Sequence, residues 1–129
     1  MLVQYHVDQH PDHVAASYLG TASRFYAKLT KSDIPGEPFY PKKILYYIGS
    51  HFRLDFSPSF VLPVSEEAFK IKIEAGKSYQ SQIKNQNRIN LADRLEWVGR
   101  YYGSMIGSPY GEPFYTPEVL GVNNLQNVL

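Results

Sequence analysis

Three of the four histidines stand within eight residues of one another near the N-terminus. The string His6-Val7-Asp8-Gln9-His10-Pro11-Asp12-His13 holds three imidazoles and two carboxylates. Imidazole nitrogens bind zinc, iron, manganese and nickel in proteins, and carboxylate oxygens often complete such sites. The residue types and their spacing therefore indicate a divalent-metal site, in a small metal-dependent hydrolase or metal-binding protein. Its candidate ligands are His6, Asp8, His10, Asp12 and His13.

Residues 8 to 13 resemble the His-x-His-x-Asp-His signature of metallo-β-lactamase-fold hydrolases. The resemblance implies that His10, Asp12 and His13 are metal ligands. It covers six residues of the 129, and Asp8 stands where that family has its first histidine. The alternative is that these side chains cap a helix and face water, because the helix dipole stabilises an Asp at a helix N-terminus without any metal.

A second pattern indicates docking. The pentapeptide Gly-Glu-Pro-Phe-Tyr occurs twice, at 36–40 and at 111–115. Proline fixes φ and removes a hydrogen-bond donor, so the sequence predicts proline-rich extended segments at 34–42 and 108–118. Aromatic rings on a stiff backbone lose little entropy on binding. We therefore expect these segments to bind a partner through outward-facing rings, at Phe39, Tyr40, Phe114 and Tyr115.

The helix expected near the C-terminus offers another docking candidate. Arg94, Trp97 and Tyr101 follow one another at spacings of three and four residues, so they share a strip of the helix surface, and Arg100 flanks it. Trp, Tyr and Arg are the residue types that dominate interface hot spots. The alternative is that Trp97 packs beneath a loop.

Composition narrows the function class. The absence of cysteine excludes disulfides, thiolate nucleophiles and cysteine-ligated metals, and it favours a reducing compartment. A formal net charge of +1 disfavours nucleic-acid binding. No apolar run approaches the roughly 20 residues that span a bilayer, so we expect no membrane contact and a cytoplasmic or virion-associated protein. No phosphate-binding glycine loop or nucleophile elbow occurs, and the leading hypothesis involves no cofactor.

The elements that must position these residues are those of one α+β domain over 1–129. The patterns predict a strand at 2–7 and a helix from 11 to about 30. An apolar stripe marks the inner side of that helix, opposite Gly20 and Arg24. A meander of three to four antiparallel strands follows, drawn from 42–56, 60–64 and 69–73, with Pro63 typical of an edge. A loop at 76–88, a helix at 91–106 and an extended tail complete the chain.

These observations favour a non-enzymatic interaction or structural subunit. It would dock on a protein partner or a second copy of itself through the proline-rich segments and the Trp/Arg/Tyr helix face. A virion component fits this profile, as does a phage- or host-encoded inhibitor protein. The metal-dependent hydrolase is the alternative function.

Overall fold

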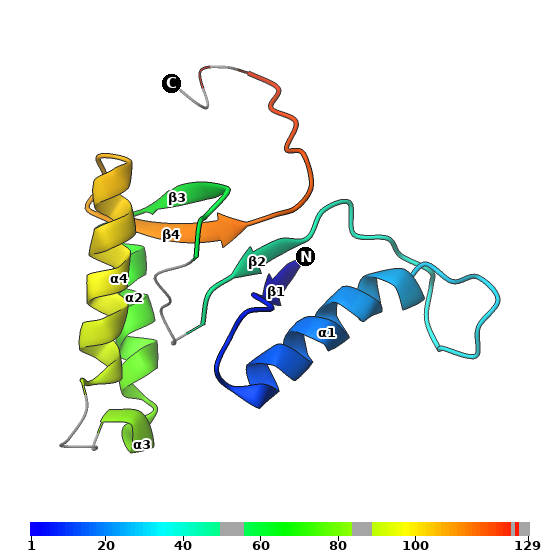
Figure 1. The fold of residues 1–129 in the computed structure, drawn as a ribbon, viewed down its shortest axis with the longest axis horizontal. Helices are drawn as coiled ribbons and strands as arrows, with labels where there is room; N and C mark the ends of the chain where they lie inside the picture. Colours follow the sequence, from blue (N-terminus) through cyan, green and yellow to red (C-terminus); the bar gives the residue numbers. More distant parts are fainter. Residues whose placement is uncertain (50–55, 84–88, 125, 127–129) are drawn as a thin grey trace.

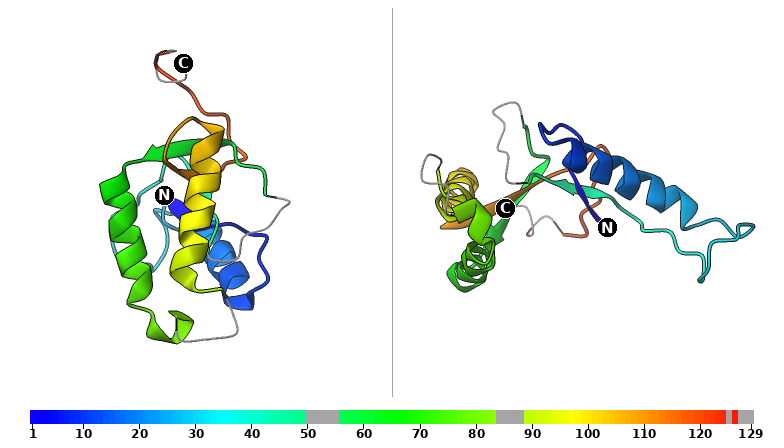
Figure 2. Two further views of the ribbon diagram at one scale, coloured as in Figure 1. Left: turned by 90° about the vertical axis from the view of Figure 1, so that its left-hand side faces the viewer. Right: turned by 90° about the horizontal axis from the view of Figure 1, so that it is seen from below.

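A four-stranded mixed sheet lies at the centre of the molecule, in the order β1-β2-β4-β3. The computed structural model describes residues 1–49, 56–83, 89–124 and 126. The strands are β1 (Leu2–Gln4), β2 (Leu45–Tyr47), β3 (Phe60–Val64) and β4 (Tyr110–Tyr115). Helix α1 lies on one side of this sheet, and helices α2 and α4 lie side by side on the other (Figures 1 and 2). The predicted α+β class is confirmed.

Strands β1 and β2 form a parallel pair because helix α1 (Pro11–Tyr26) carries the chain back between them. The sheet is therefore mixed and is not the expected antiparallel meander. Strand β4 enters between β2 and β3 and runs antiparallel to both. Strand β3 is an edge strand, as Pro63 predicts. Of the strand predicted over 42–56, Leu45–Tyr47 is observed, and residues 50–55 lie outside the described part.

The strand predicted at 69–73 is wrong, because this segment belongs to helix α2 (Glu66–Lys77). The alternation of Phe69 and Ile71 with lysines suggested a strand, but helix signals outweigh it. The Ser65 hydroxyl accepts a hydrogen bond from the Ala68 backbone N–H at 3.2 Å, and two glutamates occupy the first turn. Phe69 is consequently buried, whereas Ile71 is 71% exposed. A short helix, α3 (Gln80–Ile83), interrupts the predicted loop.

Helix α4 (Leu91–Met105) is found where the sequence predicts it. The side-chain oxygen of Asn90 caps its N-terminus, accepting from the Ala92 backbone N–H at 2.7 Å. The helix lies against β4 at Gly103, where an added Cβ would come within 2.7 Å of the Tyr110 Cα. Burial of the neighbouring Tyr102 side chain raises its pKa to about 12. None of the helices in the described residues is both long and apolar enough to cross a membrane.

Helix α1 packs on the sheet through the side that was predicted to face water. Its one buried residue is Ser17, and an added Cβ at Gly20 would lie 2.7 Å from a Val3 methyl carbon. The Thr21 hydroxyl lies 3.1 Å from the Tyr46 hydroxyl. The predicted apolar stripe points away from β1 instead. We call its exposed members the apolar face of α1: Ala15, Tyr18, Leu19, Ala22, Phe25 and Tyr26.

An ion pair joins α1 to the C-terminal segment. The Arg24 guanidinium donates to a Glu118 carboxylate oxygen and to the backbone oxygens of Pro41 and Lys42. The Lys43 amino group lies 3.5 Å from the other Glu118 oxygen. The hydrogen bond from Arg24 lowers the pKa of Glu118 below its ordinary value.

Acidification is expected to remove the stabilisation that this pair provides. Because the folded-state pKa of Glu118 is lowered, the contribution is full above the ordinary glutamate pKa of about 4.3 and is lost as the pH falls through the folded value. Thermal unfolding of wild type and Glu118→Gln between pH 7 and pH 2 should show a stability difference at neutral pH that closes below about pH 4. Glu74→Gln, at an exposed pair with Lys77, is the control. A difference independent of pH would contradict the assignment.

Candidate functional site

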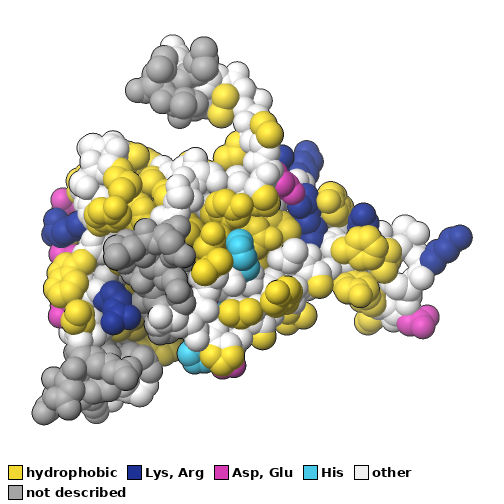
Figure 3. All heavy atoms as spheres, in the orientation of Figure 1, with side chains coloured by type: hydrophobic (Ala, Val, Ile, Leu, Met, Phe, Trp, Pro, Cys, Tyr) yellow, Lys and Arg dark blue, Asp and Glu magenta, His cyan; other side chains and the backbone are white. Residues whose placement is uncertain are grey.

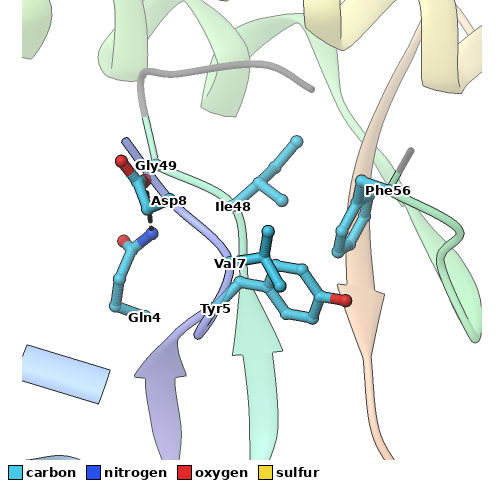
Figure 4. Close-up of a pocket in the computed structure, with 7 residues that line it drawn as sticks. All are labelled: Gln4, Tyr5, Val7, Asp8, Ile48, Gly49 and Phe56. Atoms are coloured by element: carbon cyan, nitrogen blue, oxygen red, sulfur yellow. Dashed lines mark hydrogen bonds between the residues drawn. The ribbon is translucent and has the colours of Figure 1, made fainter. Parts of the chain in front are cut away.

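The candidate site lies where the parallel strands β1 and β2 end. Carboxyl ends of parallel strands meet at one edge of a sheet, and ligands of open α/β sheets bind outside that edge. A small pocket opens there, with room for roughly one water molecule. Figure 4 shows its lining residues: Gln4, Tyr5, Val7, Asp8, Ile48, Gly49 and Phe56. The chain continues from this pocket into the N-terminus of α1, which carries the histidines.

The Asp8 carboxylate organises this edge. Its side chain is 2% exposed, and a charge so buried requires hydrogen-bond donors. One oxygen accepts from the backbone N–H of His10 at 2.8 Å. The other lies 2.9 Å from Nδ1 of His13 and 3.3 Å from Nε2 of Gln4, the contact drawn in Figure 4. Asp8 was predicted as a metal ligand, and the structure places its carboxylate against Nδ1 of His13 and the backbone N–H of His10.

The two histidines of α1 are held in different tautomers. Because the Asp8 carboxylate accepts a hydrogen bond from Nδ1 of His13, that nitrogen carries a hydrogen, and in the neutral ring Nε2 then carries the lone pair. His10 is the reverse: its Nδ1 accepts the N-cap hydrogen bond from the Asp12 backbone N–H at 3.2 Å, so neutral His10 carries its hydrogen on Nε2. The rings stack with centroids 4.9 Å apart. With both rings neutral, the geometry thus places a ring-nitrogen lone pair on His13 beside an N–H donor on His10.

The other predicted ligands, His6 and Asp12, do not complete a metal-binding group with this pair. The His6 ring contacts the aromatic rings of Tyr5, Tyr46 and Tyr115, with centroid separations between 4.4 and 6.2 Å. The Asp12 carboxylate is 87% exposed and lies 3.8 Å from Nδ1 of His10. Among the described residues, no group of three His, Asp or Glu side chains is arranged to hold a metal ion. The predicted five-ligand cluster is therefore not assembled within the described part of the chain.

The first pentapeptide copy does present its rings outward. It follows α1, and Gly36 adopts a φ of 115°, a conformation that favours glycine. The Phe39 backbone N–H donates to the Ala27 oxygen at 2.8 Å, which fixes the segment against the end of α1. Phe39 is 68% exposed and Tyr40 49%. The Arg24 guanidinium lies over the Tyr40 ring, 4.5 Å from its centroid.

The second copy is strand β4 itself. Phe114 stacks on Phe60 with ring centroids 5.4 Å apart, and Tyr115 packs edge-on against Tyr5 at 5.3 Å. Gly111 is also needed for packing, since an added Cβ would lie 2.8 Å from the Gly103 backbone nitrogen. Packing within the chain therefore accounts for Phe114 and Tyr115 without a partner. The segment is extended, as predicted, but it is a strand inside the sheet of this chain.

The predicted strip on α4 is largely exposed. Trp97 is 57% exposed and Tyr101 50%, and Arg94 is half-buried. The Arg100 guanidinium pairs with Glu96 at 2.9 Å and lies 4.9 Å from the centroid of the Tyr110 ring. Trp97 thus does not pack beneath a loop in the described structure.

Two features of functional interest were missed by the sequence analysis. The pairing of buried Asp8 with His13 could have been suspected from their spacing of five residues across a helix start, but Gln4 gave no signal. The outward apolar face of α1 could have been suspected from Ser17, Gly20 and Thr21, because small residues on one helix side permit close packing on a strand.

Comparison with known proteins gives one informative result. No protein-family model matches the chain, and no curated protein matches it. Among solved structures, the chain is similar to the crystal structure of the conserved protein TT1542 from Thermus thermophilus, with a TM-score of 0.79 and 34% sequence identity. The match covers 94% of this chain and 52% of that one. This chain therefore shares its fold with TT1542 and spans about half of that protein's length.

Proposed function

We propose that this chain carries part of a divalent-metal site for hydrolysis, with His13 as a ligand through Nε2. The observation that carries the proposal is the 2.9 Å contact between the buried Asp8 carboxylate and Nδ1 of His13. Metal-ligating histidines almost always donate their second ring nitrogen to a carboxylate or carbonyl, which fixes the tautomer and the ring orientation. The position at the carboxyl ends of parallel strands further supports a ligand site.

A divalent metal at His13 would generate a nucleophile from water at neutral pH, as such metals do in hydrolases. His10 supports the same interpretation because its Nε2–H, stacked beside His13, can donate a hydrogen bond or a proton to a group bound there. Further metal ligands are required, since zinc sites of this kind use three protein ligands. The length of TT1542, about twice that of this chain, is compatible with ligands from another part of a longer protein.

The tautomers and the ligand role are testable by NMR on untagged protein. Long-range proton–nitrogen correlation spectra near pH 8 should show hydrogen on Nδ1 of His13 and on Nε2 of His10. Titration with cobalt(II) chloride should broaden the His13 signals before those of His6, which serves as the internal control. Asp8→Asn should lower cobalt affinity about tenfold or more, because carboxylates in this position typically contribute that much.

Circular dichroism on each variant separates loss of metal from loss of fold. His13→Gln should abolish the cobalt-induced broadening of the neighbouring His10 signals while the protein stays folded, and His6→Gln should leave that broadening unchanged. A hydrogen on Nε2 of His13, or cobalt affinity that survives His13→Gln, would refute the metal proposal.

Protein docking is the second proposed function, and the apolar face of α1 favours it. Tyr18 is 73% exposed, Leu19 70% and Phe25 53%. The face continues into the first proline-rich segment, since the Lys28 amino group lies 4.7 Å from the Phe25 ring centroid and 5.3 Å from that of Tyr40. Figure 3 shows hydrophobic side chains gathered over β1 and β2 and along α1. A contiguous apolar surface of this kind marks an interaction site.

The docking proposal keeps the predicted partner-binding roles of Phe39 and Tyr40, which border this face. The strip of Arg94, Trp97, Arg100 and Tyr101 on α4 is a separate docking surface in the same proposal. The expected virion or inhibitor role and the expected localisation stay predictions. The two proposed functions are compatible, because a docked partner would lie beside helix α1, which has His10 as its N-cap and His13 in its first turn.

A further inference from the structure

We propose that the docking partner is a second α/β unit that adds a parallel strand beside β1 and covers the apolar face of α1. The inference rests on the docking function proposed above and specifies its partner. Three independent features of the described structure support it: the orientation of α1, the open edge of β1, and the relative length of the structural neighbour.

The orientation of α1 is the first feature. A helix that covers a sheet on one side and meets water on the other carries its apolar stripe toward the sheet. Here Ser17, Gly20 and Thr21 face the strands, whereas Tyr18 and Leu19 are at least 70% exposed. An apolar stripe opposite a small, close-packed side is typical of a helix that is buried on both sides.

The edge of β1 is the second feature. Strand β1 pairs with β2 in parallel register, Leu2 with Leu45 and Gln4 with Tyr47, and no described strand lies on its other side. Parallel strands occur mostly in the interior of sheets whose faces are covered. Strand β3, at the opposite edge, carries Pro63, which blunts further pairing. Of the two edges, β1 is therefore the one suited to extension.

The length of TT1542 is the third feature and identifies the kind of occupant. The match takes in 94% of this chain but only 52% of TT1542, so that protein holds about as much chain again beyond the shared fold. A unit of that size is large enough both to extend the sheet and to cover a helix. A second copy of this chain fits less well, because a two-fold axis across one continuous sheet joins its edge strands antiparallel.

The crystal structure of TT1542 offers a direct test. The positions that align with Tyr18, Leu19 and Tyr26 should be buried there by the part of that chain outside the match. A further strand should run parallel beside the one that aligns with β1. If those positions stay exposed within one TT1542 chain, and no such strand is present, the inference is overturned.

A matched substitution tests the same point in solution. Leu19→Lys in this chain should shift the thermal midpoint by less than about 2 °C, because Leu19 is 70% exposed. Lysine at the aligned position of full-length TT1542 should lower that midpoint by about 10 °C, the usual consequence of a buried unpaired charge. Tyr79→Lys, at a residue 66% exposed and away from α1, is the control in this chain and should have little effect.

Sedimentation equilibrium of this chain separates failure of the inference from failure of docking itself. The chain is expected to associate in a concentration-dependent way without a fixed stoichiometry. If Leu19→Lys reduces this association and Tyr79→Lys does not, the result supports both the docking function and the inferred partner. A discrete dimer that Leu19→Lys dissociates assigns the face to a second copy, which overturns the inference and preserves docking. Absence of association, together with an unchanged TT1542 variant, refutes both proposals.

Discussion

Replacing Gly103 by Ala is expected to lower the free energy of unfolding by about 3 kcal/mol, at the upper end of typical overpacking costs. The added methyl group would lie 2.6 Å from the Ser108 carbonyl oxygen and 2.7 Å from the Tyr110 Cα. Both atoms belong to the backbone, so no side-chain rotation can relieve the contact. Strand β4 would have to move away from α4, and β4 pairs with both β2 and β3. Urea unfolding followed by circular dichroism measures the loss.

Gly121→Ala is the matched control for this substitution. An added Cβ at Gly121 meets no atom within 4 Å, so its unfolding midpoint should stay within error of wild type. Equal stability of Gly103→Ala and wild type would show that α4 and β4 are not in the close contact described.

The two pentapeptide copies are expected to respond very differently to the same substitution. Phe114→Ala should cost about 2 kcal/mol, since it removes a half-buried ring that stacks on Phe60 across the β3–β4 pair. Phe39→Ala should cost less than about 0.5 kcal/mol, because that ring is 68% exposed. Thermal unfolding of both variants measures the difference.

The two variants are matched in local sequence, since both phenylalanines stand in the pentapeptide Gly-Glu-Pro-Phe-Tyr. Phe39→Ala is also the variant that tests docking by the first proline-rich segment, because it leaves the fold intact. Equal costs at the two positions would mean that both segments are core elements, and the docking role of Phe39 would then fail.

Local signals in the sequence were sufficient to predict where helices α1 and α4 begin. Helix α1 begins where His10, Pro11 and Asp12 predict, and α4 begins at the Asn90 cap. Capping groups act within one helical turn, so a single chain segment contains all the information. The same holds for Pro63, whose missing N–H confines it to an edge strand. The sequence also predicted His10 and His13, together with His6, Asp8 and Asp12, as residues that could bind a metal.

Long-range packing decided where those residues lie and which groups they contact. The sequence alone could not show that Asp8 is buried against Gln4 and holds His13, because that burial depends on the end of β2 lying alongside. Similarly, period-3.6 spacing locates an apolar stripe on α1 but does not say which partner it meets.

The repeated pentapeptide shows most clearly what the sequence alone does not determine. Its sequence determined that both copies would be extended, because proline restricts the backbone wherever it occurs. Only the tertiary structure decided that one copy is an exposed irregular segment that begins with Gly36 at positive φ, and that the other is a central strand with Gly111 against α4. The physical reason is that five residues fix their own dihedral angles, whereas hydrogen-bond partners and burial are supplied by segments far away in the chain.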